Sequence, residues 1–156
     1  MSLIVELMHD AVVTADPDEM VDVVVRRMCE VGVGAVVVIE DGKLRSVFSE
    51  RDVLTRVVGE GRDPAKTRVG EVSTEQVVSV TRDTHIRKCA EALKARRVRH
   101  LPVTDDEGKV VGMVSARDFF ERVSGELESW IDRAKYDEEL RQAEDPYDHL
   151  GGSYGR

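Results

Sequence analysis

The chain has 156 residues, which is enough for one domain-sized core, and 35% of them are charged. Its 23 basic and 31 acidic residues give a net charge of −8, which opposes nonspecific attraction to nucleic acid or to anionic membranes. No apolar run approaches the length of a membrane span, and the first ten residues lack the pattern of a signal peptide, so we expect a cytoplasmic protein without a membrane partner.

The first half of the chain predicts a strand, a helix, a hairpin and a second helix. Residues 11–14 are short and β-branched, as in a strand, and Asp16, Pro17 and Glu19 indicate a helix start. The apolar face of that helix recurs at helical spacing, at Met20, Val21, Val24, Val25, Met28 and Val31. We expect the helix to end at Gly32 or Gly34. Residues 35–39 and 44–48 flank a polar, glycine-containing turn and predict a β-hairpin.

The second half repeats this order. Residues 76–80 predict a strand, Thr81 is the expected helix cap, and residues 98–104 and 110–114 predict another hairpin with one extra turn residue. Ser49-Glu50-Arg51-Asp52 follows the first hairpin, and Ser115-Ala116-Arg117-Asp118 follows the second. The predicted fold class is therefore α/β (α+β), built from two βαββα repeats.

The repeated unit resembles a CBS motif, and the pair resembles a stand-alone Bateman module. The resemblance is carried most specifically by residues 98–103 and 110–115 and by Arg117-Asp118. It implies that the two copies pack about a pseudo-twofold axis, leave two clefts between them, and often associate into a disc of two modules. On this basis we expect a CBS pair over residues 1–124, with motifs at about 5–58 and 69–123.

Residues 125–156 form the remaining predicted region, a C-terminal helical extension followed by a flexible tail. Residues 126–143 favour a helix with one short apolar face, at Leu127, Trp130, Ile131 and Ala134. That face could dock on the module or on a neighbouring chain. From residue 144 onward, proline and glycines predict a flexible end.

The two Ser-x-x-Asp segments are the candidate ligand contacts. The carboxylates of Asp52 and Asp118 could each accept hydrogen bonds from both hydroxyls of a ribose. Ser49 and Ser115 could donate to a phosphate at the helix N-terminus that each begins. Flat adenine would need an apolar slot, which the strands near Val13 and Val78 could provide. The alternative interpretation is that each segment is an ordinary helix N-cap, and the two roles are compatible.

Basic residues distinguish the second copy from the first. Arg99 and His100 correspond to Gly34 and Ala35, which makes them candidate phosphate contacts, but the sequence does not assign them to either cleft. Arg51 and Arg117 are further candidates, with solvent exposure as the alternative. The whole basic segment 87–99 is either a solvated helix face or a phosphate-attracting rim. Because the second copy is the more complete, we expect Asp118→Ala to weaken binding more than Asp52→Ala.

The sequence offers no catalytic or metal-binding pattern. It contains no glycine-rich phosphate loop or nucleophile elbow, and the histidines and cysteines lack metal-ligand spacing. Cys29 and Cys89 occupy matching helix positions and are expected to be buried thiols. We therefore expect neither an enzyme nor a required cofactor.

Two functions fit these patterns. The first is a regulatory sensor that binds AMP, ADP, ATP or S-adenosylmethionine and signals to a separate effector protein. The alternative is a constitutive dimerisation or scaffold module without a small-molecule ligand. In either case we expect a homodimer, because apolar helix residues at 53, 54, 57, 119, 120 and 123 are predicted to be exposed.

Overall fold

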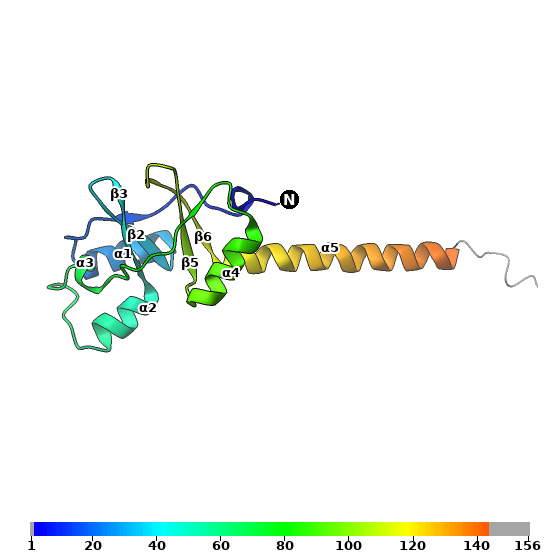
Figure 1. Cartoon of the computed structure of the whole chain (residues 1–156). Helices are drawn as coiled ribbons and strands as arrows, with labels where there is room; N and C mark the ends of the chain where they lie inside the picture. Colours follow the sequence, from blue (N-terminus) through cyan, green and yellow to red (C-terminus); the bar gives the residue numbers. More distant parts are fainter. Residues whose placement is uncertain (1, 144–156) are drawn as a thin grey trace, which may run out of the picture. The chain divides into compact units, whose positions relative to one another are not determined.

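The computed structural model of the chain describes residues 2–143, which fall into two compact units, Met1–Phe119 and Phe120–Arg156. The first unit holds both repeats (Figure 1). The expected flexible tail lies outside the described residues.

The elements of the first repeat are β1 (Thr14–Ala15), α1 (Val21–Val31), β2 (Ala35–Glu40), β3 (Lys43–Ser49), α2 (Glu50–Asp52) and the π-helical segment η2 (Val53–Val58). A short helix α3 (Val69–Val72) links them to β4 (Val80–Thr81), α4 (Ile86–Arg96), β5 (His100–Thr104), β6 (Val110–Ser115) and α5 (Ala116–Ala143).

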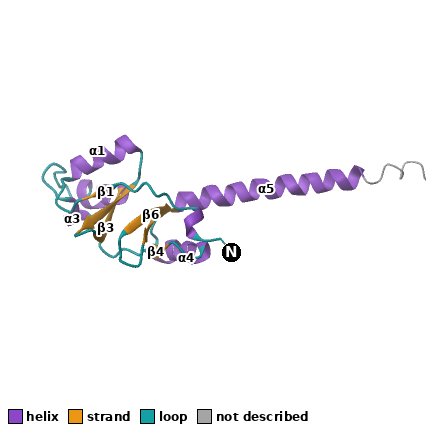
Figure 2. Cartoon of the chain, turned by 90° about the horizontal axis from the view of Figure 1, so that it is seen from above, coloured by secondary structure: helices purple, strands orange, loops and turns teal. Residues whose placement is uncertain are grey.

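Each repeat contains its own three-stranded sheet, in the order β1-β2-β3 or β4-β5-β6 (Figure 2). In each sheet the first strand is parallel to the second, and the second and third form an antiparallel hairpin. Asp41 and Gly42 both have positive φ angles, which suits the tight turn between β2 and β3. The register shifts between Val38 and Ile39 in one hairpin and between Val103 and Thr104 in the other, so even this irregularity is repeated. The predicted fold class is confirmed.

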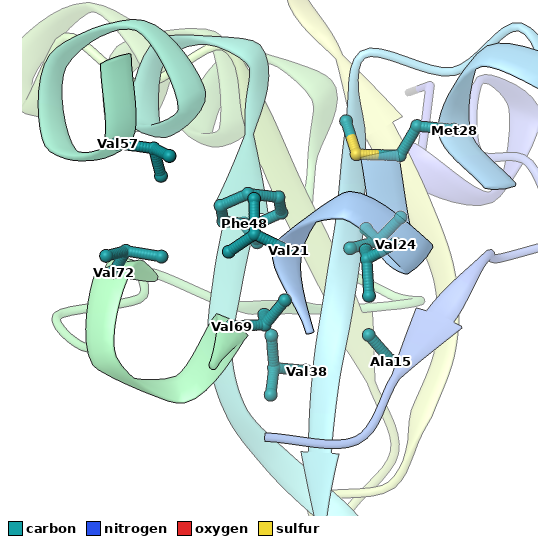
Figure 3. Packing of buried hydrophobic residues seen from close by; sticks show 10 residues of the cluster. Ala15, Val21, Val24, Met28, Val38, Phe48, Val57, Val69 and Val72 are labelled. Atoms are coloured by element: carbon teal, nitrogen blue, oxygen red, sulfur yellow. The ribbon is translucent and has the colours of Figure 1, made fainter. Parts of the chain in front are cut away.

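The two repeats also have separate apolar cores. In the first, side chains from α1, β2, β3, η2 and α3 pack together around Phe48, which is fully buried (Figure 3). The second core is smaller and includes Cys89, Leu101, Val103 and Val114. The 3₁₀-helix η1 (Ile4–Glu6) completes it, because Ile4 is fully buried there and its N–H donates to the Thr84 carbonyl at 2.9 Å. The N-terminal segment is thus part of the second repeat's core.

Both long helices of the repeats begin later than predicted. Helix α1 begins at Val21 with Met20 as N-cap, while the carboxylate of Glu19 accepts from the Asp16 N–H in the preceding turn. Helix α4 begins at Ile86 with His85 as N-cap, whose side chain accepts from the Arg87 N–H, so the predicted Thr81 cap is wrong. The first strand of each repeat is also shorter and begins later than predicted, because β1 and β4 each contain only two residues.

Several expected exposures are corrected. Cys89 is buried, but Cys29 is exposed, and both thiols are free. Val57 is buried in the first core, Val53 is half-buried against that core, and Phe119 is half-buried against the second core, so none of the three belongs to an exposed helix face. Gly32 ends α1 with a φ of 79°, which confirms the first of the two predicted ends.

Helix α5 runs without a break from Ala116 to Ala143. Residue 124, the expected end of the CBS pair, lies within this helix, and the first compact unit ends at Phe119. The expected domain bounds stay a prediction. Leu127 and Trp130 of the expected apolar face are exposed. Among the described residues, no helix is both long enough and apolar enough to cross a membrane.

Candidate functional site

A cleft of about 350 Å³ lies between the two repeats, which is within the range of small-molecule sites. The first repeat contributes the end of β3 and the start of the following helix, including Ser49, Asp52 and Arg56. The second repeat contributes the segment before β4, the end of α4 and the start of β5. Four valines supply its apolar lining, at positions 47, 77, 78 and 98. The cleft thus combines a carboxylate, apolar walls and basic side chains.

Asp52 is fixed in this cleft by both repeats. Its side chain is only 6% exposed. Oδ2 accepts from the Ser49 N–H at 2.9 Å and from the Ser49 hydroxyl at 3.2 Å, so the capping role is real. Oδ1 accepts from the Thr74 hydroxyl at 3.1 Å and lies 3.5 Å from Arg56 Nε. One carboxylate oxygen therefore holds the helix start, while the other faces groups that line the cleft.

Arginines join the two repeats across the cleft. Arg51 Nη1 donates to the Arg97 carbonyl at 3.2 Å, and Arg56 Nη1 donates to the Ser73 carbonyl at 2.9 Å. Arg96, Arg97 and Arg99 also line the cleft. Among the described residues, none of these last three makes an ion pair.

His100 is half-buried at the start of β5 and lines the same cleft. Burial lowers the pKa of His100 below its ordinary value, and the charge of Arg99 acts in the same direction. The carboxylates of Glu50 and Asp118 oppose this shift of the pKa without reversing it. Burial therefore disfavours the protonated form of His100.

Asp118 occupies the equivalent position in the second repeat but has a different partner. Its Oδ2 accepts from the N–H and the hydroxyl of Ser115, at 2.6 and 2.8 Å. Its Oδ1 lies 2.8 Å from Nε2 of His9. Burial raises the pKa of Asp118, but the hydrogen bonds from Ser115 and His9 outweigh it and hold the pKa below its ordinary value.

The structure brings six of the ten sequence-predicted site residues into the Asp52 cleft, namely Ser49, Arg51, Asp52, Val78, Arg99 and His100. The other four, Val13, Ser115, Arg117 and Asp118, are not among its lining residues. Val13 packs instead against the first core. Arg99 and His100 line the Asp52 cleft, but they also adjoin the Asp118 segment, since the Arg99 carbonyl accepts from the Ala116 N–H at 2.7 Å and His100 pairs with Ser115. They therefore do not favour Asp118 over Asp52, and which aspartate matters more for binding stays a prediction.

Sequence reasoning missed several lining residues. Arg96 and Arg97 belong to the basic segment 87–99, for which the sequence allows either a solvated helix face or a phosphate-attracting rim, and both line the cleft. Thr74 and Arg56 were missed altogether. Thr74 could have been found by extending the alignment of the repeats, since it matches His9: Thr74 bridges to Val47 as His9 bridges to Met113. Within residues 2–138, whose side chains are described, no cluster of three potential ligands could hold a metal ion.

Comparison with known proteins identifies the repeats. The family model "CBS domain" matches residues 4–59 and again residues 69–125. The chain belongs to the CBS-domain family. Its two CBS domains are the two repeats described above, and the resemblance inferred from the sequence is confirmed.

Individual relatives support this assignment. The CBS domain-containing protein CBSX3 of Arabidopsis thaliana mitochondria is 33% identical over 121 residues, which cover 74% of this chain and 58% of that protein. YhcV of Bacillus subtilis is 29% identical over 76% of this chain and 83% of its own length. This chain thus spans little more than half of CBSX3 but most of YhcV.

Solved structures share the fold. A CBS-domain containing protein from Agrobacterium tumefaciens, 27% identical, superposes with a TM-score of 0.71 over 78% of this chain and 98% of its own. The CBS domain pair of MJ0100, in complex with 5′-methylthioadenosine and S-adenosylmethionine, gives a TM-score of 0.74 over 81% of this chain and 98% of its own, at 18% identity.

Proposed function

We propose that this chain is a regulatory module that binds an adenosine-containing metabolite, AMP, ADP, ATP or S-adenosylmethionine, in the Asp52 cleft. The observation that carries the proposal is the composition of that cleft, where a nearly buried carboxylate lies beside valines and arginines from both repeats. Asp52 Oδ1 accepts from the ribose hydroxyls in exchange for its contacts with Thr74 and Arg56. The valines border the base, and the arginines contact phosphate. The adenosyl ligands of MJ0100 support this chemical class.

In this proposal a separate effector protein senses whether a ligand is bound, because both repeats line the cleft. A ligand that contacts Asp52 and Arg99 together ties the first repeat to the second, which changes their packing or rigidity. The chain contributes binding and no catalysis of its own. We also propose that the chain works in the cytoplasm. We propose that it forms a homodimer, because the apolar residues Leu54 and Val58 of η2 are 65% and 66% exposed.

Calorimetric titration of the purified chain with the four ligands, each with and without magnesium, tests the proposal. We expect saturable binding of at least one of them, and Asp52→Ala should weaken it. Arg82→Gln is the control, because Arg82 is an exposed residue outside the cleft. Failure of every ligand to bind at millimolar concentration would exclude the sensor function.

One observation favours a scaffold role at the other end of the module. There the N-terminal segment contacts the equivalent groups: the Met8 side chain and the His9 carbonyl lie close to Gly112, and His9, whose side chain is 68% exposed, contacts Asp118. A CBS pair with one ligand cleft and one end closed by its own side chains would be sensor and scaffold at once. Titration then yields one ligand per chain, whereas two ligands per chain would exclude this arrangement.

A further inference from the structure

We propose that the Asp52 cleft selects nucleotides with two or more phosphates over AMP and S-adenosylmethionine, and that Arg97 is the main specificity residue. This inference rests on the proposed function and names the ligand class of the same site. The charged side chains that line the cleft are mostly positive, whereas the net charge of the chain is negative. The chain carries a net charge of −8, yet the cleft is lined by five arginines and only two carboxylates, Glu50 and Asp52.

The carboxylates do not neutralise these arginines. Asp52 lies beside Arg56, at 3.5 Å from Nε. Glu50 is exposed and makes no ion pair among the described residues, and its side chain lies 3.3 Å from where a Cβ would stand on Gly34. Arg96, Arg97 and Arg99 thus remain without acidic partners in the described part of the chain. A ligand with several negative charges supplies the missing partners, while the cationic sulfonium and ammonium groups of S-adenosylmethionine are repelled.

The backbone at Arg97 is a second, independent observation. Arg97 ends α4 with a φ of 51°, in the left-handed region that residues with a Cβ seldom adopt. Its counterpart in the first repeat, Gly32, ends α1 with a φ of 79°. Glycine is the residue that this helix end favours, and the first repeat has it. In the second repeat, the residue at this strained helix end is an arginine that lines the cleft, and such strain often marks a functional position.

The hydrogen bond of Arg51 makes this strained residue part of the cleft. Arg51 Nη1 donates to the carbonyl of Arg97, so the end of α4 is held against the start of α2. A polyphosphate that binds the side chains of Arg97 and Arg99 would lie along this junction. The negative charge of the polyphosphate, in addition to the adenosine, would then stabilise the contact between the two repeats.

Titration with ATP, ADP, AMP, adenosine and S-adenosylmethionine, at constant ionic strength and without magnesium, tests the selection. We expect ATP and ADP to bind about tenfold more tightly than AMP, and S-adenosylmethionine to bind most weakly. Equal or tighter binding of AMP or S-adenosylmethionine overturns the inference but leaves the proposed function standing. If inorganic triphosphate competes as well as ATP does, the adenosine is not recognised, and the proposed function fails while the phosphate selection stands.

Arg97→Gly separates ligand binding from folding. The variant has the residue that the first repeat uses, so its melting temperature should equal or exceed that of the wild type. Its affinity for ATP should nevertheless fall about tenfold, with the affinity for adenosine unchanged. The charge-matched control Arg82→Gln should bind ATP like the wild type. Unchanged ATP affinity in Arg97→Gly, with the fold intact, overturns the role of Arg97.

A different observation supports a second inference, about α5. Exposed apolar residues recur on the second unit's part of this helix at alternating steps of three and four, at Phe120, Val123, Leu127 and Trp130, and Ala134 continues the series. Phe120 is 72% exposed and Trp130 is 63% exposed. This is the spacing of the a and d positions of a coiled coil. We infer that α5 pairs in parallel with α5 of a second copy of this chain.

One charge pair favours a second copy in parallel orientation, and the same heptad frame ends the apolar series at Ala134, because Asp137 falls at the next d position. With Leu127 and Ala134 at a, Arg133 falls at position g and Glu138 at position e. In a parallel pair, g of one heptad faces e of the next heptad on the other chain, so Arg133 lies opposite Glu138 of the partner subunit. An antiparallel pair does not produce this g-to-e contact.

Sedimentation of the full chain, with Leu127→Glu and a charge swap, tests the pairing. Leu127→Glu should raise the dissociation constant of the dimer, to which the η2 residues Leu54 and Val58 still contribute, and Arg133→Glu should weaken the dimer at low salt. Combining Arg133→Glu with Glu138→Arg should restore it. A monomeric wild type, or a dimer insensitive to Leu127→Glu with helicity preserved, overturns the inference.

Discussion

The Asp52 end and the Asp118 end of the module have the same backbone plan and different chemistry. Each has a Ser-x-x-Asp segment after the last strand, and each aspartate meets a residue from the segment that bridges to that strand. At one end that residue is Thr74, and at the other it is His9. The hydroxyl of Thr74 can be exchanged for a ligand hydroxyl, whereas at the other end Asp118 is contacted by the imidazole ring of His9.

The two residues that pack beside each aspartate also differ between the two ends. At the Asp52 end, the hydroxyls of Ser46 and Ser73 form a buried hydrogen bond of 2.7 Å. At the Asp118 end, Gly112 replaces Ser46, and the Met8 side chain lies against it. An internal repeat therefore lets one end keep a polar cleft while the N-terminal segment packs against the other. We expect the following changes to affect the two ends unequally.

Asp52→Ala should have the largest effect on ligand affinity. We expect it to weaken nucleotide binding by about 1.5–3 kcal/mol, the value of a hydrogen bond to a charged group, as measured by calorimetry. Asp118→Ala should leave affinity within about twofold of the wild type. Melting temperatures measured on both variants separate lost capping from lost ligand contact. A larger loss in Asp118→Ala would reverse the comparison between the two ends.

Gly112→Ser, which copies Ser46 into the second repeat, should lower the free energy of unfolding by about 1–3 kcal/mol through overpacking. A Cβ at this position would lie 3.0 Å from the Met8 methyl and 3.1 Å from the His9 carbonyl. Urea unfolding measures the effect. Gly125→Ser is the control, because a Cβ there meets nothing within 4 Å. Equal stability of the two variants would show that the N-terminal segment does not pack closely against Gly112.

Asp118→Asn should reduce stability by about 1 kcal/mol at pH 7, because the neutral amide weakens the bonds from Ser115 and His9. The folded state holds the pKa of Asp118 below its ordinary value. Its contribution is therefore present above the unfolded pKa and is lost as the pH falls through the folded pKa. Urea unfolding of wild type and variant should converge in acid. A difference that stays constant from pH 7 to pH 3 would contradict this.

The smallest expected effect is a proton linkage at His100. Burial and the charge of Arg99 lower the pKa of His100, while the carboxylates of Glu50 and Asp118 raise it. The negative charge of a bound polyphosphate would act in the same direction as these carboxylates and so raise the pKa of His100. Protons are taken up on binding, and ATP should bind about threefold more tightly at pH 6 than at pH 8. Calorimetry in buffers of different ionisation enthalpy measures the uptake, which His100→Gln should abolish. Identical uptake in that variant would assign the proton elsewhere.

The sequence predicted the hairpins and the Ser-x-x-Asp segments because alternating apolar residues and glycine turns are local signals. It misplaced the starts of α1 and α4, whose N-cap residues Met20 and His85 are not typical caps. It could not assign Arg99 to a cleft, since that depends on how the two repeats pack. It also missed the partner of Asp118, because His9 lies 109 residues away in the chain.

A crystal structure of the chain with bound ATP would show where the nucleotide binds. We expect one nucleotide per chain, with its ribose hydroxyls at Asp52 Oδ1, its base beside Val78 and its phosphates at Arg97 and Arg99. The N-terminal segment should keep His9 on Asp118. A nucleotide bound at Asp118, with His9 displaced and the Asp52 cleft empty, would contradict this expectation.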